Sequence, residues 1–354
     1  MNTGTHTWQE IESQPEVWKA ALDGFAASRS ALESFLEQSA FAQIVAVGCG
    51  STHYLAQAAA AALTCRTETP CRALPSSELW LFEDAVPKEG VLLLTISRSG
   101  TTTETLRAQE RFRETNSGAV LNITCHPESP LAQGADFVLA APAAQEQSVA
   151  QTRSFTSMLL LSLALTAVLA HDEAMLQQLG RLPSALQDLF ASLDDLPHRV
   201  GSALSIRHLV FLGAGPLYGL ANEAMLKTKE MSLSNSEAYH PLEFRHGPMS
   251  LVDEHTLVVA LLSDSGLTEE VAVLRDMQEL GARTLALAQD ASVFVGWQPD
   301  HVIELHSGLD EWERGPLYLP PIQRLAFHRS VAKGLNPDEP RHLTAVVELG
   351  GGGT

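Results

Sequence analysis

The sequence contains few cysteines and few basic residues. Its cysteines, Cys49, Cys65, Cys71 and Cys125, form no C-x-x-C pair. The pattern therefore offers no zinc signature and is typical of reduced thiols in a cytoplasmic protein. Lysines and arginines number 23 against 42 aspartates and glutamates, which gives a formal net charge of −19. Nucleic acids and anionic membrane surfaces attract positively charged proteins, so this charge argues against both as partners.

Long apolar runs are also lacking. The longest, MLLLSLALTAVLA at residues 158–170, is too short to cross a bilayer, and no segment resembles a signal peptide. What the chain does have is size, because 354 residues with 45% hydrophobic content can bury a large core. This length favours two domains.

Two segments share the same order of predicted elements. Residues 44–63 (IVAVGCGSTHYLAQAAAAAL) and 209–227 (LVFLGAGPLYGLANEAMLK) each predict a buried strand, a Gly-x-Gly turn and a helix. Their first glycines are Gly48 and Gly213, so the second segment lies a whole domain's length beyond the first. This wide spacing predicts two similar α/β domains and not a short repeat array.

Further strand-like runs occur in both halves, at residues 91–96, 119–124, 136–141, 256–262 and 284–288. Helical patterns lie between them, and residues 150–170 predict a long, largely buried helix. This alternation indicates parallel sheets with helices on both faces. The predicted organisation is an N-terminal helical segment (1–34), a first domain (35–175), a linker (176–199), a second domain (200–341) and a C-terminal tail (342–354).

Hydroxylic residues are concentrated directly after one predicted strand. The strand ends at Ile96 and is followed by SRSGTTT, residues 97–103, and then by a helical pattern. Free N–H groups at a helix start, joined by serine and threonine hydroxyls, can bind a phosphate, and Arg98 would add a charged donor. The alternative is ordinary helix capping, but one cap needs only one hydroxyl. The excess of hydroxyls favours an anion site.

The Gly-x-Gly turns permit a second interpretation. GCGSTH at 48–53 would add Ser51 and Thr52 to the anion site, but such turns also occur in dinucleotide-binding folds. A dinucleotide site needs an acidic residue about 20 residues further on, at a strand end. After Gly213 the corresponding region, residues 230–239, is expected to be helical. Nicotinamide binding is therefore disfavoured.

Several motifs together resemble one family. They are VGCGSTHYLA, TISRSGTTTETL, QSVAQTRSFT and the long segment from FLGAGPLYGL to EFRHGPMSLV. The chain is similar over nearly its whole length to proteins with two sugar-isomerase (SIS) domains, including the isomerase domain of glucosamine-6-phosphate synthase and the SIS-type aminosugar-phosphate deaminases. The resemblance implies an α/β fold of two tandem SIS domains, each a flavodoxin-like sandwich of three layers.

The resemblance also implies roles for individual residues. Ser97, Arg98, Ser99 and Thr102 fall on the family's phosphate loop, where glutamine is common at the position of Arg98. The sugar is implied to contact Gly50, Ser51, Thr52, Val149 and Gln151. The implied catalytic residues are Lys227, Glu230 and His246, and neither a metal nor another cofactor is implied.

The implied chemistry is aldose–ketose isomerisation through an enediol. This reaction needs a carboxylate near C1 and C2 and an acid/base at the ring oxygen, roles that match Glu230 and His246. Glu223, Lys227 and Glu230 are spaced four and three residues apart, so one helix face displays all three. From spacing alone, a solvated salt-bridge face is the commoner explanation, and a lone histidine is more often structural. In the family the histidine comes from the neighbouring subunit, which implies a homodimer with a shared active site.

Two departures from the family limit the activity. The family's C-terminal motif carries a lysine near the sugar carbonyl, whereas this sequence has Ala345 there, and alanine cannot form a Schiff base. Ring opening is then expected to rest on His246. The chain begins MNTGTHTWQE without an N-terminal cysteine, so a glutaminase domain is not expected.

We therefore expect an enzyme that acts on a sugar phosphate, either as a phosphosugar isomerase or as an aminosugar-phosphate deaminase/isomerase. A non-catalytic sugar-phosphate-binding regulator and a fructosamine-6-phosphate deglycase remain as alternatives. The departure at Ala345 favours the regulator, and substrate profiling would separate the deglycase.

Overall fold

The computed structural model describes residues 3–82 and 84–344. The chain separates into two compact units. One, called here the first-sheet unit, comprises residues 16–146, 153–180 and 344. The other, the second-sheet unit, comprises residues 3–15, 147–152 and 181–343. Each unit is built from more than one segment, and the domain boundaries given above remain sequence predictions.

The first-sheet unit contains five parallel strands in the order β2-β1-β3-β4-β5. They are β1 (Gln43–Gly48), β2 (Cys71–Pro75), β3 (Val91–Ser97), β4 (Val120–Thr124) and β5 (Phe137–Ala140). The helices are α2 (Gln14–Gln38), α3 (Ser51–Arg66), α4 (Ser76–Leu81), α5 (Thr103–Thr115), α6 (Pro130–Gln133), η1 (Pro142–Ala144), α7 (Arg153–Leu169) and α8 (Glu173–Leu179). The chain order reverses between β1 and β3, which is where ligands bind in open α/β sheets.

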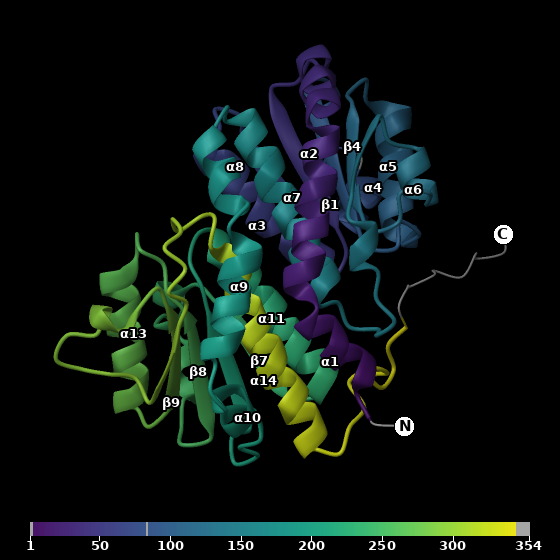
Figure 1. Ribbon diagram of the computed structural model, residues 1–354. Coiled ribbons are helices and arrows are strands. Elements are labelled where there is room, and N and C mark those ends of the chain that lie inside the picture. The colour runs from purple at the N-terminus through teal and green to yellow at the C-terminus, as the bar shows by residue number, and fades with distance from the viewer. Residues whose placement is uncertain (1–2, 83, 345–354) are drawn as a thin grey trace. The chain divides into compact units, whose positions relative to one another are not determined.

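Burial on both faces explains why β3 is a continuous apolar run. All seven of its residues are buried. Val91 and Leu93 belong to one core cluster with Leu79 of α4 and Phe112 of α5. Because side chains alternate along a strand, Leu92 faces the opposite side of the sheet, where α3 and α7 pack together. Figure 1 shows α4 and α5 on one side of this sheet and α3 and α7 on the other.

The second-sheet unit repeats this plan. Its five parallel strands have the order β10-β9-β8-β6-β7, which read from β7 back to β10 is the same order as in the first sheet. They are β6 (His208–Leu212), β7 (Asn235–Tyr239), β8 (Thr256–Leu261), β9 (Arg283–Ala288) and β10 (His301–Glu304). The prediction of two tandem α/β sandwiches is therefore confirmed.

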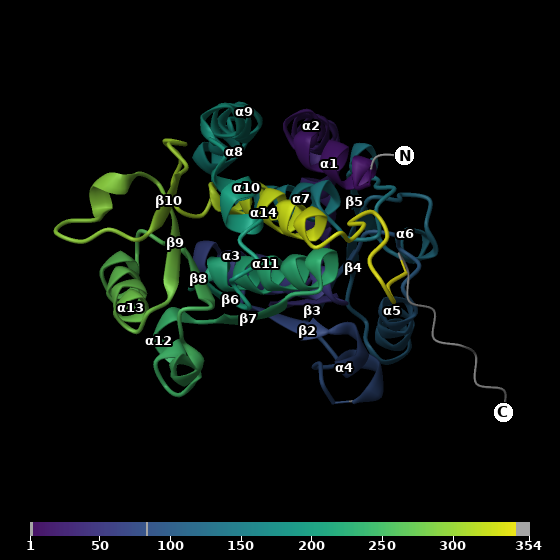
Figure 2. The same ribbon diagram turned by 90° about the horizontal axis from the view of Figure 1, so that it is seen from below.

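Helices also cover both faces of the second sheet. Figures 1 and 2 show α13 on one side of β8 and β9, with α11 and α14 on the other. The helices of this unit are α1 (Thr5–Glu12), α9 (Leu182–Ser192), α10 (Leu196–Gly201), α11 (Pro216–Ser232), α12 (Pro241–Phe244), η2 (Pro248–Leu251), α13 (Leu267–Glu279), η3 (Ala291–Val293), η4 (Gly315–Tyr318) and α14 (Leu319–Ala332).

One expected helix is wrong in part. The sequence predicts helix at residues 230–239, but α11 ends at Ser232 and Leu233 adopts φ 47°, in the left-handed region. Residues 235–239 then form β7, which pairs with β6. A left-handed residue stops an α-helix because its backbone cannot continue the hydrogen-bond pattern, and apolar periodicity does not reveal it.

Three other sequence expectations have plain outcomes. The long helix expected at 150–170 is α7, whose residues 154–168 are all buried. The predicted linker at 176–199 is largely helical, with α9 at its centre. Most of the predicted tail, including Ala345, lies outside the described residues. Among the described residues, the helices are too short or too polar to cross a membrane.

Candidate active site

Two loops of the first-sheet unit meet at the point where its strand order reverses. One follows β1 and the other follows β3. In the first loop Gly50 has φ 56° and ψ −124°, a conformation that residues with a side chain rarely adopt. The Thr52 hydroxyl accepts from Cys49 N at 2.9 Å and donates to Cys49 O at 3.0 Å. Thr52 therefore closes the turn, while Ser51, which is also buried, begins α3.

The second loop, residues 97–102, is held in a tight turn. Gly100 has φ 64°, and a Cβ atom there would lie 1.9 Å from Ser129 Oγ, so only glycine fits. Its N–H donates to Ser97 Oγ at 3.0 Å. The Gly100 carbonyl accepts from Leu131 N at 3.1 Å, which fixes the loop to the next element of the unit.

The hydroxyls of Ser97 and Ser99 accept hydrogen bonds within the loop itself. Ser99 Oγ accepts from Thr101 N at 3.2 Å and from Thr101 Oγ1 at 3.1 Å. Thr102 is the N-cap residue of α5, yet its side chain makes no capping hydrogen bond within the described part of the chain. Helix capping therefore does not account for the hydroxyls of Ser97, Ser99 and Thr102 within the described part of the chain. The hydroxyl of Thr102 and the start of α5 form a surface of hydrogen-bond donors.

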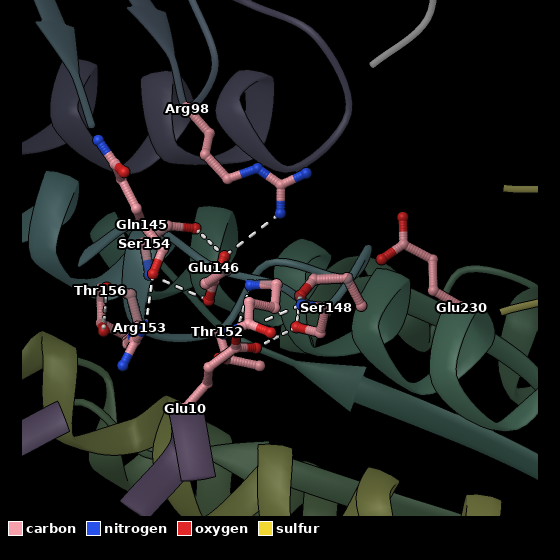
Figure 3. Close-up of polar contacts among 12 residues, drawn as sticks. Glu10, Arg98, Gln145, Glu146, Ser148, Thr152, Arg153, Ser154, Thr156 and Glu230 are labelled. Atoms are coloured by element: carbon pink, nitrogen blue, oxygen red, sulfur yellow. Dashed lines mark hydrogen bonds and ion pairs between the residues drawn. The ribbon is translucent and has the colours of Figure 1, made fainter. Parts of the chain in front are cut away.

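Arg98 of the same loop is paired with a carboxylate that sequence analysis did not identify. Arg98 Nη1 lies 3.3 Å from Glu146 Oε2, and the exposed fractions of the two side chains are 10% and 0%. Ser154 N, in the first turn of α7, also donates to Glu146, at 3.2 Å. Figure 3 shows the three residues together. Glu146 is far from Arg98 in sequence, so no local pattern announces the pair.

The predicted sugar-lining segment at Val149 belongs to the second-sheet unit and is held by the N-terminal helix. Glu10 of α1 is 3% exposed and accepts hydrogen bonds from Gln147 N at 2.5 Å, Ser148 N at 3.3 Å and Ser148 Oγ. Val149 N donates to Asp338 O at 3.1 Å. The contact between Glu10 and Ser148 is drawn in Figure 3. Glu10 therefore fixes the backbone of this segment, a role that sequence analysis missed.

Gln151 carries an unsatisfied acceptor. Its Oε1 atom is buried and accepts no hydrogen bond from the described residues. Burying an amide oxygen without a donor costs free energy, so such atoms are rare in native proteins. A sugar hydroxyl would be a suitable donor, which fits the role implied for Gln151 by the family resemblance.

Helix α11 displays Glu223, Lys227 and Glu230 on one face. Lys227 is 1% exposed, and its Nζ lies 3.6 Å from Glu223 Oε1 and donates to Glu230 Oε2. Glu223 is fully buried and the Glu230 side chain is 19% exposed. The alternative of a solvated salt-bridge face is therefore wrong, because two of its three groups are out of contact with water.

This cluster is costly to fold and suits proton transfer. Removing ions from water carries a desolvation penalty that surface ion pairs avoid, so buried charged groups often mark functional sites. Glu230 is the member that keeps contact with solvent. It is therefore the carboxylate that a ligand can reach, with Lys227 and Glu223 behind it.

His246 lies apart from these groups in sequence, in an exposed turn between α12 and η2. Its backbone N–H donates to Glu243 O at 3.0 Å. The neighbouring His240 stacks on Tyr218 with ring centroids 3.7 Å apart, and burial lowers the pKa of its imidazole. His246 is thus available at the surface of its unit.

Within the described residues, no group of three or more histidine, cysteine or acidic side chains could hold a metal ion.

The second-sheet unit has a counterpart of the phosphate loop that sequence analysis missed. Ser263-Asp264-Ser265-Gly266, between β8 and α13, repeats the Ser-x-Ser-Gly pattern of residues 97–100. The spacing of Gly48 and Gly213 could have found it, because the same spacing counted from Ser97 leads to Leu262, the residue directly before this segment. Carboxylates occupy its donors: Ser263 N and Oγ donate to Glu270 at 2.7 and 2.8 Å, and Ser265 N and Oγ donate to Glu311 at 3.1 and 2.7 Å.

Comparison with known proteins identifies the chain's relatives. It is 31% identical over 309 residues to glutamine–fructose-6-phosphate aminotransferase (isomerizing) of Legionella pneumophila, covering 86% of this chain and 50% of the relative. The chain thus spans about half the length of the curated relatives it matches. Among solved structures, it resembles tagatose-6-phosphate ketose/aldose isomerase of Escherichia coli (TM-score 0.86, 29% identity, 95% of each chain). It also resembles glucosamine-6-phosphate deaminase of Thermotoga maritima (TM-score 0.79, 28% identity, 98% of this chain and 100% of that one).

A family model covers most of both sheets. The SIS domain model matches residues 39–168 and 204–324, one segment for each sheet. Together with the repeated strand order, this match establishes that the chain belongs to the SIS-domain family, with two SIS domains in tandem.

Proposed function

We propose that the chain is a phosphosugar aldose–ketose isomerase or an aminosugar-phosphate deaminase/isomerase of the glucosamine 6-phosphate/fructose 6-phosphate type. The observation that carries the proposal is the buried cluster on α11, in which Glu230 keeps limited exposure beside Lys227 and Glu223. Solved relatives named as a glucosamine-6-phosphate deaminase and a ketose/aldose isomerase support it.

The phosphate group of the substrate would bind to residues 97–102. Backbone N–H groups at the start of α5 and the hydroxyls of Ser99 and Thr102 would donate to its oxygens. Ser51 and Gly50, together with Val149 and Gln151, would contact the sugar. The buried acceptor on Gln151 supports this assignment, because it needs a donor that a sugar hydroxyl supplies.

The reaction would move one proton between neighbouring carbons. With His246 assisting ring opening at the ring oxygen, Glu230 would take the proton from C2 of the open aldose and return it to C1 through an enediol. Lys227 would hold the Glu230 carboxylate in place. With a 2-amino sugar the same transfer gives a ketimine, and water then releases ammonia and leaves fructose 6-phosphate.

We infer that the working form is a homodimer in which His246 reaches the site of the neighbouring subunit. The elements on either side of the turn that carries His246 expose two large apolar side chains, Leu242 of α12 (47%) and Leu251 of η2 (63%). Exposed apolar groups around a polar residue are typical of a protein interface.

The four free cysteines support a reducing, cytoplasmic setting.

Turnover assays test the proposal directly. The full chain is incubated with glucosamine 6-phosphate and, separately, with fructose 6-phosphate, while ammonia, ketose and aldose are followed. Exchange of the C2 proton with deuterated solvent is measured in parallel. Glu230→Gln should abolish turnover and exchange, while Glu279→Gln, an exposed change on α13, should leave both intact. Binding of a sugar phosphate without turnover or exchange would instead indicate the non-catalytic regulator.

A mixing experiment tests the shared site. Glu230→Gln and His246→Asn dimers should each be inactive, but after subunit exchange a mixed dimer would contain one intact site. Statistical mixing should then restore about a quarter of the wild-type rate. Activity of unmixed His246→Asn protein, or failure of mixing to restore any activity after exchange has been verified, would contradict the shared site.

A further inference from the structure

The buried pair of Arg98 and Glu146 has a consequence for phosphate binding. Arg98 is the cation that the sequence places in the phosphate loop, and its side chain is 10% exposed. Its Nη1 atom lies 3.3 Å from the fully buried carboxylate of Glu146. Two opposite charges at this separation in a poorly hydrated place strongly offset each other's field. The loop is therefore not simply a positively charged cradle.

Glu146 is fixed by more than the arginine. Ser154 N donates to its Oε1 at 3.2 Å, and Ser154 Oγ donates to its Oε2. These donors belong to the first turn of α7, a helix of 17 residues whose N-terminus carries partial positive charge. Arg98 and the first turn of α7 thus both hold the carboxylate in place. It cannot easily move away when an anion reaches the loop.

A buried thiol shows that both charges act on the same region. Burial is the main cause that raises the pKa of Cys125, and the negative charge of Glu146 raises it further. Arg98 and Arg153 act in the opposite direction. Arg153 begins α7, and its Nη2 also donates to Gln145 O. Arg98 is the one of these two arginines that belongs to the loop, so its balance with Glu146 is what a phosphate there would meet.

We propose that Glu146 is a positioning and charge-balancing residue of the phosphate loop, which holds Arg98 and offsets its charge so that a sugar phosphate binds with moderate affinity and can be released. The proposal rests on the proposed function only in taking residues 97–102 as a phosphate site. It assigns Glu146 no direct contact with substrate. An enzyme that must release a phosphorylated product gains from this arrangement, because an uncompensated arginine would hold a dianion tightly.

The test measures the affinity of the full chain for inorganic phosphate by calorimetry at pH 8, where phosphate is a dianion. Glu146→Gln keeps the size of the side chain and removes its charge, so it should tighten phosphate binding by about tenfold, the change expected for removing one repulsive charge at an effective dielectric constant of about 20. Arg98→Gln leaves the carboxylate unbalanced and should weaken binding by at least tenfold. The double variant Arg98→Gln/Glu146→Gln should recover most of that loss.

A matched pair in the same unit supplies the control. Arg66 Nη2 and Asp172 Oδ2 lie 2.6 Å apart, and Asp172 accepts from the first turn of α8 as Glu146 does from that of α7. Arg66 ends α3, whereas the Gly50 loop precedes that helix, so this pair lies at the opposite end of α3 from the loop. Asp172→Asn should lower the melting temperature and leave the dissociation constant for phosphate unchanged.

The outcomes separate the inference from the function on which it rests. Opposite effects of the two single changes, with recovery in the double variant, support charge balance. If Glu146→Gln folds and binds phosphate as wild type does or more weakly, the pair is only structural and the inference is overturned, whatever the turnover assays show. Should Arg98→Gln fail to fold, the Glu146→Gln measurement alone still decides. Failure of the wild-type chain to bind phosphate would contradict both the loop assignment and the inference.

Discussion

The two Ser-x-Ser-Gly loops share the same framework but differ in what their hydrogen-bond donors contact. Each follows the central strand of its sheet and precedes a helix, and in each the glycine N–H donates to the first serine, at 3.0 Å in the first loop and 2.9 Å in the second. In the first loop the N-cap hydroxyl of Thr102 makes no capping bond to any described residue. In the second, Glu270 and Glu311 take the serine donors and Arg314 pairs with Asp264, with nitrogen–oxygen distances of 2.5 and 2.7 Å.

The difference shows that a loop motif alone does not make an anion site. Both loops can donate hydrogen bonds, but a loop whose donors already serve carboxylates of its own chain has none left for a ligand. Acidic residues near the motif therefore decide between the two outcomes.

Replacing the loop glycines should separate the two loops most strongly. Gly100→Ala places a methyl group 1.9 Å from Ser129 Oγ at a positive φ, so the first loop must rearrange, and phosphate affinity should fall by about 100-fold or more. Gly266→Ala meets Glu270 and Ser263 at 2.9–3.0 Å and should cost stability with no loss of phosphate affinity. Calorimetry with inorganic phosphate measures both. A similar loss in both variants would contradict the assignment of the site to the first loop.

The second loop should make stability depend on pH. Burial is the main cause that raises the pKa of Glu270 to about 6 from its ordinary value of 4.5, and the charge of Glu311 adds to it. The folded state therefore prefers the protonated form of Glu270. The contribution of this carboxyl group to the free energy of unfolding is fully present below pH 4.5 and is lost as the pH rises through 6. The change amounts to about 2 kcal/mol. Urea unfolding of wild type and Glu270→Gln between pH 4.5 and 7.5 measures it, and the two slopes should differ in this window. Identical slopes would contradict the raised pKa.

Removing one hydroxyl from each loop should affect binding in only one of them. Ser99→Ala deletes a hydroxyl that can donate to a phosphate and should weaken binding of inorganic phosphate by about tenfold, as expected for one hydrogen bond to a charged group. Ser265→Ala deletes a hydroxyl that already donates to Glu311 and should leave phosphate affinity unchanged. Equal losses would mean that the carboxylates do not block the second loop.

The smallest expected effect concerns the contact between Ser265 and Glu311. Because this contact is exposed, Glu311→Gln should reduce the free energy of unfolding by less than about 1 kcal/mol. Phosphate stoichiometry should stay the same as in wild type, because Glu270 still occupies Ser263. Urea unfolding and calorimetry measure the two quantities. A larger loss of stability would show that Glu311 anchors the segment that leads to η4.

Sequence patterns predicted the inner strands and missed most outer ones. The apolar run of β3 is visible because every residue is buried. The outer strands β2 and β7 carry the sequences CRALP and NSEAY, and few of their residues are buried. An outer strand has one neighbour and a partly hydrated surface, so it does not need a continuous apolar run. These strands were therefore not recognised from hydrophobicity.

The candidate site was predictable where it is local. Residues 97–102 and the α11 cluster follow from motifs and helical spacing, although the spacing did not reveal that Lys227 and Glu223 are buried. The partners Glu146 and Glu10 act on segments 48 and 137 residues away. Such pairs depend on the packing of distant elements, for which a single sequence carries no direct signal.

The hydrogen bonds that Glu10 accepts from residues 147–148 affect where the chain can be shortened. A fragment that starts at residue 39, where the family match begins, would retain all ten strands described here. It would lose the acid that accepts hydrogen bonds from Gln147 and Ser148. The segment that carries Val149 and Gln151 would then have to find other anchors. Crystallisation or screening programmes that trim this protein to its family boundaries would keep the proposed ligand-site residues but remove the hydrogen bonds from Glu10 that hold one of their segments.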